Sequence, residues 1–188
     1  TRSPDGLTVN LFIGSTVTID DVAGTRLRVV QTTDYPWSGK VSLTIHPAAA
    51  TRFALRIRVP NRQTSPLYTN TPTADGLTSL TVNGEPVKPR IEHGYAVLKR
   101  TWKAGDRVDA EVPMPIQRVQ ADQRIAANRG RVALRRGPLL YNLESVDQNL
   151  DAVLSTTAPL TTEWRPDLLD GVMVIRSTPR AVRYGVVV

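Results

Sequence analysis

The sequence has 188 residues, and its 24 basic and 17 acidic side chains give a formal net charge of +7. Hydrophobic residues make up 40% and charged residues 22%, values that suit a folded domain and exclude collagen-like, coiled-coil and wholly disordered chains. Cysteine is absent, so these residues can form neither a disulfide framework nor a thiolate metal site.

Apolar and polar residues alternate through the first half of the chain, which predicts half-buried β-strands. Turn sequences such as Asn83-Gly84 separate these runs at short intervals and favour tight antiparallel hairpins. No convincing helical period interrupts them. The residues expected on buried faces are Leu7, Val9, Leu11 and Ile13; Val41, Leu43 and Ile45; Phe53, Leu55, Ile57 and Val59; and Val108, Ala110 and Val112.

Two prolines, Pro113 and Pro115, interrupt a strand pattern and predict a domain border. The Thr- and Pro-rich stretch 61–74 is typical of a long exposed loop. Further strands are expected at 116–119, 131–134, 138–143, 172–175 and 181–187, with a less regular one at 151–154. We therefore predict an all-β protein of two small antiparallel, jelly-roll-like β-sandwich domains, residues 1–115 and 116–188. The second domain could be completed by other parts of a parent chain.

The two histidines, His46 and His93, lie in or beside turns and have no companion at a metal-ligand spacing. Solvent-facing loop histidines are therefore the favoured interpretation, and we expect no metal site here. A serine nucleophile has no support either, because Gly14-Ser15 lacks the second glycine and the strand-to-helix context of a nucleophile elbow. Counting residues alone leaves a Ser-His-Asp triad open, but no motif supports it.

Three carboxylates, Asp106, Asp109 and Glu111, lie close together in the sequence. Paired carboxylates carry out most glycoside hydrolysis, which makes this group a candidate. On a strand, however, Asp109 and Glu111 share one face with Arg107, so the charges can neutralise one another across exposed positions. A solvated strand face is the favoured interpretation.

A basic cluster in the second half of the chain is the strongest charge feature and could attract a polyanion such as nucleic acid. No aromatic residue falls between Trp102 and Tyr141 to stack on bases, so nucleic-acid binding is the less favoured interpretation. The cluster consists of Arg118, Arg124, Arg129, Arg131, Arg135 and Arg136.

Tyr35 and Trp37 flank a proline in a turn and form the best candidate for a carbohydrate contact, because an aromatic face matches the C–H face of a sugar ring. Packing in the core is the alternative role for these aromatics. Trp102 and Trp164 are weaker candidates for the same contact.

Eight short strings follow one another in a characteristic order, and together they are specific although each alone is weak. They are Gly6–Ile13, Gln31–Val41, Phe53–Pro60, Val82-Asn83-Gly84, Gly94–Trp102, Gly105-Asp106, Val112-Pro113-Met114 and Val132–Tyr141. In this order they resemble the C-terminal β-sandwich region of glycoside hydrolase family 127, the β-L-arabinofuranosidase family. The residues after Glu144 resemble the family's last strands only loosely.

The resemblance implies a partner that is not in this sequence. In that family a helical (α/α)6 barrel precedes the sandwiches and holds a cysteine nucleophile beside zinc. With no cysteine here, none of the family's catalytic residues maps onto this chain, and zinc is implied only for the barrel. We therefore expect a non-catalytic accessory portion that supports the barrel, is inactive alone, and exposes an apolar patch where the barrel would pack. The family's Cys-Cys segment would lie just before Thr1.

Two alternatives remain open at this point. One is a stand-alone carbohydrate-binding β-sandwich that uses the exposed aromatics on arabinose-containing glycans, and the other is a polyanion-binding domain whose affinity falls with salt. No apolar run approaches the roughly 20 residues that cross a bilayer. Residues 1–6 contain no apolar signal core either, so we expect a soluble chain in an undetermined compartment.

Overall fold

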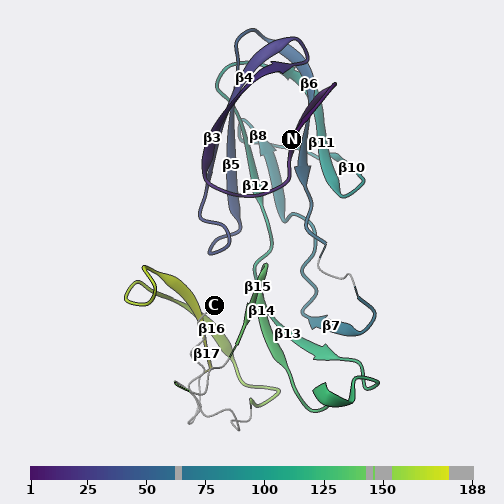
Figure 1. The fold of residues 1–188 in the computed structure, drawn as a ribbon, viewed down its shortest axis with the longest axis vertical. Coiled ribbons are helices and arrows are strands. Elements are labelled where there is room, and N and C mark those ends of the chain that lie inside the picture. Colours follow the sequence, from purple (N-terminus) through teal and green to yellow (C-terminus); the bar gives the residue numbers. More distant parts are fainter. Residues whose placement is uncertain (62–64, 143–145, 147–153, 178–188) are drawn as a thin grey trace. The chain divides into compact units, whose positions relative to one another are not determined.

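The structure is a computed structural model that describes residues 1–61, 65–142, 146 and 154–177 (Figure 1). It confirms the all-β class, because the described regular elements are strands and one short 3-10 turn, Ala126–Asn128. Contacts divide the chain into unit 1, residues 1–62 and 74–113, and unit 2, residues 63–73 and 114–188. The chain therefore enters unit 2 once, returns to unit 1, and enters unit 2 again.

Unit 1 contains two sheets. The first has the order β1-β2-β6-β11-β10, and all its pairs are antiparallel except β2 with β6, which is parallel. Its strands are β1 (Arg2–Ser3), β2 (Gly6–Val9), β6 (Thr51–Arg58), β10 (Arg90–Glu92) and β11 (Tyr95–Trp102).

The second sheet of unit 1 has the order β3-β4-β5-β12-β8-β9 and is antiparallel throughout. Consecutive positive φ angles at Asn83 and Gly84, 53° and 86°, close the β8–β9 hairpin, as the Asn-Gly pair predicted. Its strands are β3 (Ser15–Val22), β4 (Thr25–Thr33), β5 (Lys40–Pro47), β8 (Ser79–Val82), β9 (Glu85–Pro86) and β12 (Asp106–Glu111).

Side chains from both sheets meet in one core, which makes unit 1 a β-sandwich. Trp102 lies at its centre with no exposed surface, and the indole Nε1 donates to the Phe53 carbonyl oxygen at 3.2 Å. The predicted faces of β5, β6 and β12 are buried, apart from half-buried Val59 just beyond β6.

The prediction for the first strand is wrong at two positions. Leu7 is buried, but β2 ends at Val9, and Leu11 and Ile13 are 62% and 58% exposed. Phe12 between them is buried instead. Once the chain leaves the strand, the alternation of period two no longer decides which side chain turns inward.

Unit 2 contains a four-stranded sheet of order β15-β14-β13-β7 and the separate hairpin β16–β17. A small core forms from Leu134, Tyr141 and Ile175. β16 ends immediately before Pro166, whose ring disfavours continuation of the strand. The strands are β7 (Tyr68–Thr71), β13 (Ile116–Ala121), β14 (Ala133–Arg136), β15 (Leu139–Tyr141), β16 (Leu160–Arg165) and β17 (Val172–Ser177).

The stretch 61–74 is not only a loop, as its composition suggested. Its residues Tyr68–Thr71 form β7 and pair antiparallel with β13, far away in sequence. The strand expected at 181–187 and most of the one at 151–154 lie outside the described residues.

Candidate functional site

The turn with the predicted sugar-contact residues connects β4 to β5. Its backbone is closed by hydrogen bonds from the Trp37 and Ser38 amides to the Asp34 carbonyl oxygen, at 2.7 and 3.1 Å. At its start, Thr33 Oγ1 accepts a hydrogen bond from the Tyr35 amide at 3.0 Å and donates to the Lys40 carbonyl at 2.7 Å. The turn therefore holds its two aromatic residues in defined positions.

Tyr35 and Trp37 are both half-buried in this turn. The Tyr35 ring meets the buried Phe12 ring edge to face, with centroids 5.5 Å apart and an interplanar angle of 81°. One side of Tyr35 is thus anchored in the sandwich while part of its surface stays accessible. Stacking of either aromatic on a sugar ring stays a prediction.

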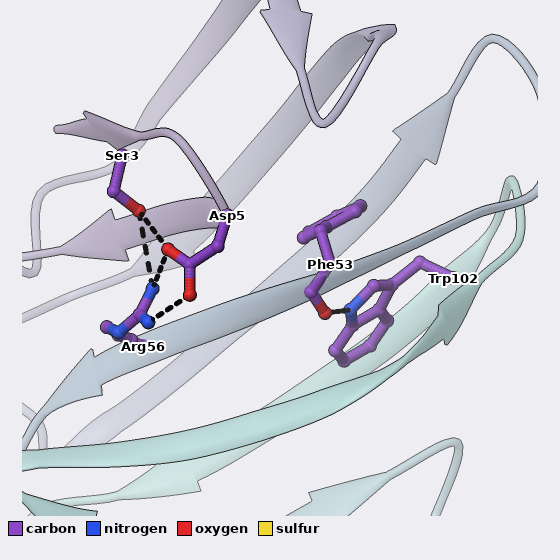
Figure 2. A network of polar contacts seen from close by, with 5 residues as sticks. All are labelled: Ser3, Asp5, Phe53, Arg56 and Trp102. Carbon is purple, nitrogen blue, oxygen red and sulfur yellow. Dashed lines mark hydrogen bonds and ion pairs between the residues drawn. The ribbon is translucent and has the colours of Figure 1, made fainter.

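A second polar constellation ties the start of the chain to the middle of the first sheet (Figure 2). Arg56 on β6 donates from Nη2 to Asp5 Oδ2 at 2.6 Å and from Nη1 to Asp5 Oδ1 at 3.1 Å. Ser3 Oγ donates to the same carboxylate at 3.0 Å. The Arg56 hydrogen bond, supported by Ser3, lowers the pKa of Asp5 to about 2. Asp5 is therefore ionised at neutral pH and unsuited to acid catalysis.

Backbone contacts reinforce this tie between β2 and β6. The Ala54 amide donates to the Asp5 carbonyl oxygen at 2.9 Å. A Cβ at Gly6 would lie 1.9 Å from the Ala54 carbonyl oxygen, so only glycine fits this approach. The constellation is a structural clamp on the parallel β2–β6 pair.

The acidic group on β12 has local partners rather than the arrangement of a catalytic pair. Arg107 Nη2 lies 2.8 Å from Asp109 Oδ1, which confirms the predicted neutralisation on the strand face. Partial burial opposes ionisation of Asp106, but hydrogen bonds from Asn83 Nδ2 at 2.9 Å and the Lys103 amide at 2.8 Å outweigh it and lower its pKa. Asp106 is therefore not held protonated, as a general acid would require.

The histidines do not assemble a metal site. His46 lies half-buried on β5, and His93 is exposed in the β10–β11 turn. Within the described ranges, no group of three His, Asp or Glu side chains could hold a metal ion. The chain has no cysteine, so it cannot supply the thiolate ligands of the zinc site that the family resemblance implies for the barrel.

The arginine cluster lies in unit 2, and four of its members donate to oxygen atoms of nearby residues. The contacts are Arg118 Nη2 to the Ala158 carbonyl at 2.9 Å, Arg124 Nε to Asp122 Oδ1 at 2.8 Å, Arg129 Nε to the Gln123 carbonyl at 2.8 Å, and Arg135 Nε to the Gly137 carbonyl at 3.0 Å. Each of these four arginines thus uses part of its donor capacity within the protein.

Sequence reasoning missed a groove of about 600 Å³ in unit 1, lined by Arg2, Ser3, Pro4, Asp21, Ala23 and Gly24. Its charged side chains contact each other, with Arg2 Nη1 3.5 Å from Asp21 Oδ2. Asp21 Oδ1 also accepts the Gly24 amide at 3.0 Å. The lining comes from two segments of the sequence, residues 2–4 and 21–24, and only the fold brings them together.

Two family models match the chain. "Beta-L-arabinofuranosidase, GH127 middle domain" matches residues 6–114, and "Glycoside hydrolase family 127 C-terminal domain" matches residues 116–179.

Among the described residues, no helix is long and apolar enough to span a membrane.

Relatives of known sequence or structure agree with these matches. The chain is 35% identical over 159 residues to a non-reducing end β-L-arabinofuranosidase of Bifidobacterium longum subsp. longum, covering 78% of this chain and 22% of that protein. A GH127 β-L-arabinofuranosidase structure from Geobacillus stearothermophilus T6 superposes with a TM-score of 0.82 at 37% identity, covering 94% of this chain and 27% of that one. A further GH127 β-arabinofuranosidase structure superposes with a TM-score of 0.82 at 28% identity. The match covers 92% of this chain and 28% of that one. The chain thus spans only about a quarter of the length of these relatives.

Proposed function

The chain belongs to glycoside hydrolase family 127, and from this premise we propose that it serves a β-L-arabinofuranosidase as the non-catalytic support of a catalytic (α/α)6 barrel. It comprises the family's middle and C-terminal domains, and the parent enzyme would act on arabinose-containing glycans. The observation that carries the proposal is the pair of domain matches on a chain without cysteine. A nucleophilic cysteine and its zinc would belong to the barrel.

The described side chains support a structural role. The Asp5 carboxylate is bound to Arg56, Asp109 is paired with Arg107, and Asp106 at the start of β12 accepts hydrogen bonds. Catalysis by two carboxylic groups needs one of them protonated near neutral pH, whereas the hydrogen bonds of Asp5 and Asp106 lower the pKa of each. The sandwich core of unit 1 supplies instead a rigid body on which another domain can pack.

The proposal is tested by hydrolysis of a nitrophenyl β-L-arabinofuranoside. We expect no turnover above background by the chain alone, at any pH between about 4 and 9. Activity should appear when the preceding portion of the G. stearothermophilus relative is supplied. Turnover by the purified chain alone would overturn the proposal.

A carbohydrate contact is the second candidate function, favoured by the hydrogen-bonded turn that holds half-buried Tyr35 and Trp37. We propose that these aromatics contact an arabinose-containing oligosaccharide. Titration calorimetry should show saturable binding that Trp37→Ala abolishes. Tyr68→Ala is the matched control, because Tyr68 is an aromatic residue 42% exposed on β7 in unit 2. Binding that persists in Trp37→Ala would refute this assignment.

A further inference from the structure

The loop between β2 and β3 presents large aliphatic side chains to solvent. Leu11 and Ile13 are 62% and 58% exposed, whereas Phe12 between them is 6% exposed. Val17, four residues further on the edge strand β3, is 45% exposed. Single exposed apolar residues are common, but several in one short stretch indicate an interaction surface. We call residues 11–13 the apolar loop.

The apolar loop is held in place by specific contacts. Gln31, which is 8% exposed, donates from its side-chain amide to the Leu11 carbonyl at 3.1 Å and to the Ile13 carbonyl at 2.5 Å. Phe12 packs edge to face against Tyr35 beneath the loop. The exposure of Leu11 and Ile13 is therefore a fixed feature of the fold. A surface that is ordered before binding loses less entropy when a partner docks.

The start of the chain lies beside this loop. The Thr1 amino group donates to the Thr8 carbonyl at 2.8 Å, and Asn10 Nδ2 donates to Thr1 Oγ1 at 2.9 Å. Asn10 is itself fixed, because its Oδ1 accepts the Tyr95 hydroxyl at 2.8 Å. In Figure 1 the N-terminus lies near the beginning of the loop that crosses to β3. Any polypeptide that precedes Thr1 would therefore enter next to the apolar loop.

We propose that the apolar loop is the docking surface for the catalytic portion that precedes the middle domain in this family. This inference rests on the proposed function and names the surface that carries it. The match to a middle domain begins at residue 6, so in a family protein the preceding portion is tethered within a few residues of Leu11. The apolar loop therefore lies where the preceding portion joins the middle domain.

The test is a binding titration between the intact 188-residue chain and the separately purified preceding portion of the G. stearothermophilus relative. We expect Ile13→Thr to weaken binding by at least about fivefold, and Leu11→Asn with Ile13→Thr by at least about fiftyfold. Ile91→Thr is the matched control and should bind as the unchanged chain does. Ile91 is 56% exposed and lies on β10, the edge of the first sheet opposite to β1.

The melting temperature of each variant checks that it folds. Because all three side chains are exposed, each variant should melt within about 2 °C of the unchanged chain. If the double variant binds as tightly as the unchanged chain, the apolar loop is not the docking surface, whereas the proposed function is unaffected. Failure of the unchanged chain to bind contradicts the proposed function and the docking surface together. If the unchanged chain self-associates and only the double variant does not, the proposal is overturned, because the loop then binds a second copy of the chain.

Discussion

Replacement of Gly6 by alanine should break the junction between β2 and β6. An alanine Cβ at this position would lie 1.9 Å from the Ala54 carbonyl oxygen, and ordinary contact begins near 3.4 Å. The two strands must therefore separate by about 1.5 Å, the difference of these distances. That movement stretches the 2.9 Å hydrogen bond from the Ala54 amide to the Asp5 carbonyl beyond bonding range.

The expected cost combines two effects. Overpacking of a tight site costs about 1–3 kcal/mol, and each lost ladder hydrogen bond costs about 1 kcal/mol. With that one bond lost, Gly6→Ala should reduce the free energy of unfolding of unit 1 by about 2–4 kcal/mol. For a domain of this size that corresponds to a melting temperature lower by more than about 8 °C.

Urea unfolding followed by tryptophan fluorescence measures this effect. A Trp164→Phe background removes the unit 2 tryptophan and leaves Trp37 and Trp102 to report on unit 1. Gly14→Ala is the matched control, because the nearest atom to its Cβ is the Thr33 carbonyl oxygen at 3.7 Å, an ordinary contact. A Gly6→Ala protein that unfolds within about 0.5 kcal/mol of the Gly14→Ala protein would refute the reasoning.

Three further changes test the clamp, the core and the hairpin of unit 2. The pKa of Asp5 falls from 3.8 to about 2 on folding, so its contribution to stability is present above pH 3.8 and is lost as the pH falls through about 2. Asp5→Asn should therefore weaken the dependence of the melting temperature on pH between about pH 5 and 2. A variant whose melting temperature falls with pH as steeply as that of the unchanged chain would contradict this role. Trp102→Phe removes the hydrogen bond to the Phe53 carbonyl and leaves space in the core, so urea unfolding should show a loss of about 1–3 kcal/mol; no measurable loss would contradict the packing. Gly171→Ala places a Cβ 2.3 Å from the Trp164 ring at a φ of 115°, so the emission of Trp164 should shift; an unaltered spectrum would disprove that contact.

The sequence predicted the strands whose two faces differ in polarity. In β5, Val41, Leu43 and Ile45 are buried between half-buried polar neighbours, so local alternation was sufficient. It was insufficient for the apolar loop, because the parallel pairing of β2 with β6 and the point where β2 ends depend on residues distant in sequence. The same holds for β7, which becomes a strand through pairing with β13.

The candidate site was predictable only in part. The Arg107–Asp109 pair follows from strand geometry and was anticipated. The bond between Asp5 and Arg56 was not, since these residues come together only when β2 pairs with β6. For Tyr35, the sequence indicated an accessible aromatic in a turn, and the structure adds its packing on Phe12.

The central claim, that this chain supports a catalytic portion, is tested most directly by the thermal stability of that portion. The preceding portion of the G. stearothermophilus relative is melted alone and with increasing concentrations of the chain. A partner that binds only the folded state raises the melting temperature with its concentration. We predict such a rise, accompanied by higher arabinofuranosidase activity. A melting temperature and an activity that stay unchanged at the highest chain concentration would contradict the account.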